Sequence, residues 1–135
     1  MKIYIAARYS RKDEMKRHAQ ELWDMGHWIT SQWIWRNEDD EDEVSWRGYA
    51  EEDMIDLLKA STLIQFSDEQ YTPQRGGKHV ELGMAVAWHK RIYIVGPKEN
   101  VFHCLLQCKR FDSWEECVES LGPAIQGTLP LFKEV

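Results

Sequence analysis

The sequence predicts an α/β fold, a doubly wound, flavodoxin-like sandwich built on a parallel sheet of about five strands. Short apolar runs of the buried-strand type recur along the chain and alternate with amphipathic segments of helix length. Connections of that length between strands of one sheet form right-handed crossovers, which make the sheet parallel and cover both of its faces. The 135 residues also suit one domain, spanning 1–135, with a single core.

The first elements are a strand at 2–7 ("KIYIAA") and a helix at about 11–25. Ser10 is the expected N-cap of this helix, and Gly26 ends it. A second strand is expected in "HWITSQWIW", residues 27–35, running into a loop. The inward stripe of the first helix comprises Met15, Ala19 and Leu22.

The middle of the chain begins with the acidic run "RNEDDEDEVS", which is typical of a solvated loop. A second helix is expected from Val44 or Ser45 to Lys59, followed by a third strand at 61–67. The spacing of the apolar residues predicts the buried face of this helix to be Ala50, Met54, Leu57 and Leu58.

The second half opens with a glycine-led helix at 77–89, followed by a fourth strand at 91–97. A short strand and an amphipathic helix are expected in "KRFDSWEECVESLG", with Ser113 as the cap of that helix. The spacing assigns one face of the glycine-led helix to Val80, Met84, Ala87 and Trp88.

Ligands of doubly wound sheets bind outside the carboxyl ends of the strands. The loops expected at that edge are "ARYSR" (7–11), "QWIWR" (32–36), "SDEQYTPQRGG" (67–77) and "GPKENVFH" (96–103).

Composition excludes several classes of function. The formal net charge is -6 and no basic stripe stands out, so nucleic-acid binding over a broad surface is not expected. The N-terminal apolar run is too short for a signal sequence and no stretch approaches a membrane span, which predicts a cytoplasmic protein with no membrane partner. The three cysteines form no disulfide framework. His103, Cys104 and Cys108 lack a fourth ligand, so no metal is expected.

Glu81 is the first carboxylate of interest, in the stretch "QRGGKHVELGMAVAW". Gly76 and Gly77 permit a close approach of the backbone to a ligand and open a helix N-terminus, which accepts anions and polar groups. Glu81 is expected in the first turn, on the shoulder of the apolar face, where the helix dipole favours an ionised carboxylate suited to act as a nucleophile. On spacing alone, a helix-favouring glutamate in a dipole-friendly turn fits equally well.

Asp53 is the second carboxylate, at the edge of the apolar stripe of its helix, whereas Asp56 is expected to face solvent. If that helix ends near the same cleft, Asp53 and Glu81 form a pair in which one group holds a proton while the other stays ionised. Such pairs cleave glycosidic bonds, and in a retaining mechanism they lie roughly 5 Å apart. This is one pairing among 23 acidic residues.

Other candidates lie close to the predicted strand ends. Tyr4, near the end of the first strand, can hydrogen-bond a carboxylate, although a core aromatic fits as well. Arg8, Ser10 and Arg11 flank a helix N-terminus that suits a phosphate, or they are a cap and two surface charges. The tryptophans that bracket the acidic run either stack on a nucleobase or pack, and they are Trp33, Trp35 and Trp46.

Four segments, in order along nearly the whole chain, resemble the nucleoside 2-deoxyribosyltransferase family, which includes the deoxynucleoside 5'-monophosphate N-glycosidases. They are "KIYIAARYS", "EEDMIDLLKASTLIQFSD", "RGGKHVELGMAVAWHKRIYIVGP" and "ENVFH". The resemblance implies cleavage of the N-glycosidic bond of a nucleoside or nucleotide, with transfer of the sugar to another base or to water. It makes Glu81 the nucleophile that forms a glycosyl ester, Asp53 the residue that assists at the nucleobase, and Tyr4 the residue that orients the nucleophile.

The resemblance also implies a homo-oligomer, a homodimer or larger, and no cofactor. Members of the family often complete the site from a neighbouring subunit, so Asn100 and His103 are expected to act in trans. The small-molecule substrate is expected to contact Arg8, Ser10, Arg11, Trp33, Arg75, Gly76, Gly77, His79 and Asn100.

Two departures from the family leave the exact reaction open. Transferases of the family tend to carry a further base-contacting aspartate where this chain has Arg75, and the nucleotide hydrolases have a serine- and glycine-rich first loop where it has "AARYSRKDE". Transferase and hydrolase, and nucleoside and 5'-nucleotide, therefore remain alternatives. A noncatalytic nucleotide-sensing module on the same fold is the rival interpretation. Another type of phosphoribohydrolase ranks low because its "PGG-x-GT" pattern is absent.

Overall fold

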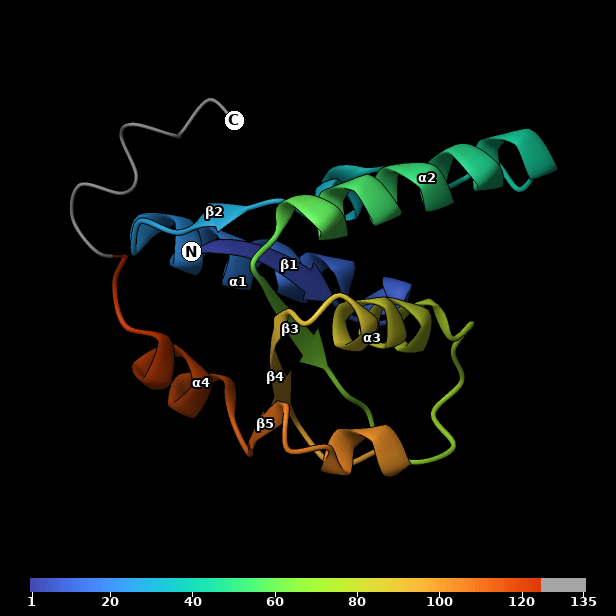
Figure 1. Ribbon diagram of the computed structural model, residues 1–135. Helices are drawn as coiled ribbons and strands as arrows, with labels where there is room; N and C mark the ends of the chain where they lie inside the picture. The colour runs from blue at the N-terminus through green and yellow to red at the C-terminus, as the bar shows by residue number, and fades with distance from the viewer. Residues whose placement is uncertain (125–135) are drawn as a thin grey trace.

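A five-stranded parallel sheet forms the centre of the computed structural model, which describes residues 1–124 (Figure 1). The strand order is β2-β1-β3-β4-β5, the flavodoxin-like order that the sequence predicts. The chain leaves β1 toward β2 on one side and returns to β3 on the other, so the order reverses between β1 and β3. The strands are β1 (Lys2–Ala6), β2 (Trp28–Ile29), β3 (Thr62–Phe66), β4 (Arg91–Val95) and β5 (Cys108–Phe111).

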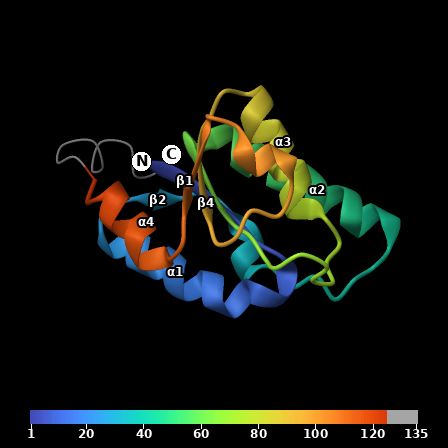
Figure 2. The ribbon, with the colours of Figure 1, turned by 90° about the horizontal axis from the view of Figure 1, so that it is seen from below.

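Helices cover both faces of the sheet, as the doubly wound arrangement requires. Figure 2 shows α2 and α3 on one face and α1 and α4 on the other. The α-helices are α1 (Lys12–Asp24), α2 (Glu43–Lys59), α3 (Gly77–Ala87) and α4 (Trp114–Leu121). Three 3-10 turns are η1 (Tyr9–Arg11), η2 (Gln32–Trp35) and η3 (Val101–Cys104).

The core lies on the two faces of the central strands. Because both faces are covered, β1 and β3 are apolar along most of their length and do not alternate with polar residues. Ile3, Ile5, Leu63 and Ile64 are all fully buried, and each such side chain stabilises the fold by about 1.5–3 kcal/mol. The predicted inward stripe of α1 is confirmed, since Met15, Ala19 and Leu22 are buried. Ser113 is the cap of α4, because its side chain accepts from the Glu116 backbone N–H at 3.2 Å.

The second strand, expected at the start of residues 27–35 and running into a loop, is only two residues long. Only Trp28 and Ile29 pair with β1. Two residues later, the backbone N–H of Ile5 donates to the side-chain oxygen of Ser31 at 3.0 Å instead of to a strand carbonyl, so the ladder stops. The chain then turns into η2, which directs Trp33 inward to donate to the Ile5 carbonyl at 2.7 Å.

The predicted N-cap Ser10 is wrong. Ser10 lies within η1, and α1 begins at Lys12 after Arg11, whose side chain makes no capping hydrogen bond. The hydroxyl of Ser10 instead accepts from the guanidinium of Arg8.

Two helix faces differ from their predictions. On α2, Leu57 and Asp56 are buried, whereas Met54 and Leu58 are 44% and 55% exposed. Asp56, predicted to face solvent, is 1% exposed because it accepts from the backbone and side-chain N–H groups of Gln32 at 2.9 and 3.0 Å. On α3, the buried residues are Lys78, Leu82 and Ala85, whereas Val80 is 63% exposed.

Two expectations concern membranes and metals. Within residues 1–124, no helix is long and apolar enough to cross a bilayer. The same residues hold no group of three or more histidine, cysteine, aspartate or glutamate side chains placed to bind a metal ion. Cys104 is exposed in η3, while Cys108 is buried in β5.

Candidate active site

A cavity of about 430 Å³ opens at the carboxyl ends of the strands, beside the point where the strand order reverses. The loop after β1, the segment around η2, the helix α2 and the start of α3 all contribute to its wall. The lining residues are Ala7, Arg8, Tyr9, Ser10, Trp33, Arg36, Glu38, Glu41, Asp53, Pro73, Gln74, Arg75, Gly76, Gly77, Lys78 and Glu81.

The glycine pair sets the start of α3. Gly76 adopts a left-handed conformation with φ of 92°, which a side chain would strain, and its carbonyl accepts from the backbone N–H of His79 at 3.0 Å. The helix begins at Gly77, so Glu81 lies in the second turn, one turn beyond its predicted place. The dipole effect decays within the first turn, and the charge of Glu81 is therefore set mainly by its other neighbours.

Glu81 has a buried phenol as its partner. The hydroxyl of Tyr4, a fully buried residue of β1, donates to Oε2 of Glu81. Burial and the nearby charge of Glu81 raise the pKa of Tyr4 well above its ordinary value, so the phenol keeps its proton and remains a donor. Burial also raises the pKa of Glu81 to about 8, against the lowering effect of the Tyr4 hydrogen bond and with a further increase from Asp53.

Asp53 has a guanidinium as its partner. Its Oδ1 lies 3.0 Å from a terminal nitrogen of Arg36, and its side chain is 24% exposed. Burial raises the pKa of Asp53 to about 6, with hydrogen bonds from Arg36 opposing the increase and Glu38 and Asp56 adding to it. The two carboxylates therefore line the same cavity and titrate in different ranges.

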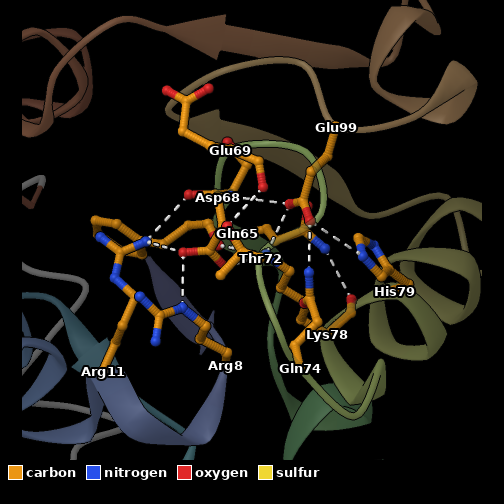
Figure 3. A network of polar contacts seen from close by, with 12 residues as sticks. Arg8, Arg11, Gln65, Asp68, Glu69, Thr72, Gln74, Lys78, His79 and Glu99 are labelled. Atoms are coloured by element: carbon orange, nitrogen blue, oxygen red, sulfur yellow. Dashed lines mark hydrogen bonds and ion pairs between the residues drawn. The ribbon is translucent and has the colours of Figure 1, made fainter.

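A network of ion pairs joins the loop after β1 to the start of α3 (Figure 3). The ammonium of Lys78, with a side chain 1% exposed, contacts Asp68 at 2.6 Å and Glu99 at 2.7 Å. Asp68 also accepts from Arg8 at 2.9 Å and from Arg11 at 3.2 Å. Burial alone would raise the pKa of Asp68, but the hydrogen bonds from Lys78 and Arg8 outweigh it and leave the pKa below its ordinary value. The network thus ties the loop after β1 to the ends of β3 and β4 and to the start of α3.

The structure brings most of the predicted site residues to this cavity. Eight line it directly, and Tyr4 is connected to it through its hydrogen bond to Glu81. The eight are Glu81, Asp53, Arg8, Ser10, Trp33, Arg75, Gly76 and Gly77.

Three predicted substrate contacts lie outside the lining. Arg11 directs its guanidinium to Glu14, Asp68 and the Ser67 carbonyl. His79 and Asn100 contact each other at 3.3 Å.

The predicted action of His103 in trans does not fit its surroundings. The ring is 1% exposed, and its two nitrogens contact the Gln65 side-chain oxygen at 2.7 Å and the Glu99 backbone N–H at 2.9 Å. Both partners belong to the same chain, so the imidazole has no nitrogen to offer a second subunit.

Sequence reasoning missed several residues of the site. Arg36 lies in the loop "QWIWR" that was expected at the functional edge, but an arginine ahead of an acidic run reads as a solvated charge. Lys78 follows the glycine pair, and its place in the first turn of a helix suggests a solvent-exposed residue. In the structure it is only 3% exposed. A lysine near an N-terminus, where the dipole disfavours a cation, was the available signal that a buried carboxylate lies nearby.

Arg75 contributes to the mouth of the cavity. Its guanidinium lies 3.4 Å from Glu41 and 5.4 Å from the ring centroid of Trp46, both from the segment at the start of α2. The side chain is 78% exposed, so this contact is a weak surface pair that bridges two sides of the opening.

Comparisons with known proteins bear on the fold. No protein-family model matches the sequence, and no curated protein sequence matches it. Among solved structures, a 2-deoxyribosyltransferase of Bacillus psychrosaccharolyticus matches with a TM-score of 0.69 and 18% identity, over 93% of this chain and 100% of that chain. A CMP N-glycosidase of Clostridium botulinum matches with a TM-score of 0.60 and 17% identity, over 90% of this chain and 98% of that chain. The chain therefore has the fold of a 2-deoxyribosyltransferase and of a CMP N-glycosidase, and the resemblance drawn from the sequence is confirmed at the level of the fold.

Proposed function

We propose that this protein cleaves the N-glycosidic bond of a nucleoside or nucleotide, with deoxyribose or ribose as its sugar, through a covalent glycosyl ester on Glu81, and transfers the sugar to another base or to water. The observation that carries the proposal is the arrangement of Glu81, Tyr4 and Asp53 about one cavity. The cavity lies where a flavodoxin-like sheet binds ligands, and its size of about 430 Å³ suits a nucleoside. The shared fold with two enzymes that act on such bonds adds support.

In the first step, a carboxylate oxygen of Glu81 attacks the anomeric carbon while the bond from that carbon to the base nitrogen breaks. The electron pair of the broken bond goes to the base, and Asp53 donates a proton to it. The donated hydrogen bond from Tyr4 holds one oxygen of Glu81, which fixes the direction of the other. The products are a neutral base and a glycosyl ester.

In the second step, an acceptor attacks the anomeric carbon and Glu81 leaves as a carboxylate. Asp53, now ionised, takes the proton of the acceptor as the new bond forms. A second base as the acceptor gives a transferase, and water gives a hydrolase. Two displacements on one carbon retain its configuration.

The decisive experiment is intact-protein mass spectrometry after mixing with a panel of deoxynucleosides and deoxynucleotides. We expect a deoxyribosyl adduct that maps to Glu81 and release of free base. Glu81→Gln keeps the shape and the acceptor for Tyr4 but loses the nucleophile, so it should form no adduct. Base release without an adduct would refute the covalent step. Binding without base release would instead favour the noncatalytic nucleotide-sensing module.

We further propose a second copy of the chain as the protein partner, as the resemblance implies. The support is an apolar group that α2 and α3 leave exposed: Met54, Ile55, Leu58 and Val80 are 44%, 52%, 55% and 63% exposed. Sedimentation equilibrium should give a dimer or larger, and Leu58→Glu should weaken it. A monomer at micromolar concentration would contradict the assignment.

A further inference from the structure

Arg36 is a charged residue of the cavity wall to which the proposed mechanism assigns no task. It follows η2 directly, lines the cavity, and has a side chain 13% exposed. Its backbone carbonyl accepts from the ammonium of Lys12 and from the hydroxyl of Tyr9. The residue is therefore held at its backbone by the start of α1 as well as at its side chain.

The guanidinium of Arg36 has no donor left for a ligand. A guanidinium carries five N–H donors. Nε and one terminal nitrogen donate to Glu38, and the other terminal nitrogen donates to Glu52 at 2.7 Å. The two remaining bonds reach the two oxygens of Asp53, at 3.0 and 3.4 Å. All five donors thus end on carboxylates of the protein.

We propose that Arg36 is a positioning residue of the reaction, which holds Asp53 toward the leaving base by a forked pair and does not itself bind substrate. The inference rests on the proposed function, because it assigns Asp53 to the base. A single hydrogen bond would let the carboxylate rotate about its terminal torsion, whereas a fork fixes the plane of both oxygens. The ring of Tyr49 lies 4.6 Å from the guanidinium carbon and limits its movement on the side of α2.

The charges that face Asp53 show what the loss of Arg36 would do. Glu38 lies beside it, Asp56 is on the same helix, and Glu81 lines the same cavity. All three are acidic, so Arg36 is the one cation that acts on Asp53 among the groups that shift its pKa. Without Arg36, burial and the neighbouring carboxylates would raise the pKa of Asp53 further, and the carboxyl would lose the forked pair that fixes its direction.

The test compares Arg36→Met with the matched control Arg110→Met. Arg110 is a half-buried arginine of β5 that donates to the Gly96 carbonyl at 2.9 Å and to Asp112 at 2.8 Å, away from the cavity lining. We expect Arg36→Met to lower kcat by about tenfold with little change in KM, and to move the pH limb that depends on Asp53 upward by about one unit. Arg110→Met should change neither. Circular dichroism checks that both variants fold.

Two further variants separate positioning from a merely structural role. Arg36→Lys keeps the charge without the fork, so the pH limb should return toward its original position while kcat recovers only in part. In an Asp53→Asn background, Arg36→Met should cost almost nothing more, since the residue that it positions is gone. An equal loss in both backgrounds, or an unmoved pH limb, would overturn the proposal.

NMR titration of the Asp53 carboxyl carbon measures the pKa of Asp53. It therefore tests the pairing of Asp53 with Arg36 even if no substrate is turned over. An upward shift of the Asp53 pKa in Arg36→Met, together with no turnover by the unmodified protein, would refute the proposed function but support the pairing of Arg36 with Asp53. No shift would sink the inference about Arg36 whatever the activity.

Discussion

Glu81 and Asp53 face the same cavity but are held by opposite means. The partner of Glu81 is the neutral hydroxyl of Tyr4, and the partner of Asp53 is the fork of Arg36. Burial is the largest influence on both pKa values, which stand at about 8 for Glu81 and about 6 for Asp53. The comparison teaches that burial and the partner together set each pKa, because Glu81 is the more deeply buried acid and a cation opposes the shift at Asp53 more strongly than a hydroxyl does at Glu81.

The order of these two pKa values has a consequence for the proposed chemistry. The proposed reaction needs Glu81 ionised and Asp53 protonated, whereas near neutral pH the higher pKa of Glu81 places the proton on Glu81. The pair carries one proton in either arrangement, so activity requires the proton to move within the pair. Positive charge developing at the anomeric carbon favours an ionised Glu81, and negative charge on the leaving base favours a protonated Asp53. The charges that develop on the substrate therefore favour movement of the proton from Glu81 to Asp53.

The largest expected effects on turnover come from replacing each of the two carboxylates in turn. Glu81→Gln should abolish turnover of every substrate, because no covalent ester can form. Asp53→Asn should lower kcat/KM by about 10²- to 10⁴-fold for ordinary bases, but far less for a synthetic glycoside whose leaving group needs no proton. Steady-state rates on the two kinds of substrate measure the difference. An equal loss in Asp53→Asn on both kinds would show that Asp53 does not assist the leaving group.

Both carboxylates and Tyr4, the partner of Glu81, are predicted from the sequence, whereas Arg36, the partner of Asp53, is not. The fold follows from short apolar runs alternating with helices, and Glu81 and Asp53 can be ranked by their place on those helices and by the family resemblance. Arg36 is invisible because its three acidic partners come from both a loop and a helix, a contact that only the tertiary structure creates. Asp56 shows the same limit, since a helical pattern predicts it outward while the backbone of η2 draws it inward.

A smaller effect is expected in the pH dependence of kcat/KM, which tests the different pKa values of Glu81 and Asp53. With one proton shared by the pair, kcat/KM should rise as the pH passes about 6, where the doubly protonated form is lost, and fall above about 8, where the last proton leaves. Tyr4→Phe removes a hydrogen bond that lowers the pKa of Glu81, so the upper limb should move to higher pH while the maximum falls by about tenfold. A flat profile between pH 5 and pH 9, or a downward shift in Tyr4→Phe, would contradict a shared proton.

The smallest expected effect concerns stability, and it extends the comparison beyond the cavity. The folded pKa of Glu81, about 8, exceeds its unfolded value, so ionisation of Glu81 opposes folding increasingly as the pH rises from about 4.5 to about 8. Glu14 is the opposite case, because its bond to Arg11 lowers its pKa and so stabilises the fold above the unfolded pKa. Glu81→Gln should therefore raise Tm at pH 8 by roughly 5 °C and leave it nearly unchanged at pH 5.

The matched control is Glu14→Gln, which should lower Tm at neutral pH, with the difference shrinking as the pH falls and the native carboxylate gains its proton. Thermal unfolding followed by circular dichroism at several pH values measures both variants. If Glu81→Gln lowered Tm at pH 8 as Glu14→Gln does, Glu81 would be a stabilising surface charge. In that case the burial of Glu81 beside Tyr4 would not destabilise the fold. The idea that the fold loses stability to keep the proposed nucleophile in the cavity would then be wrong.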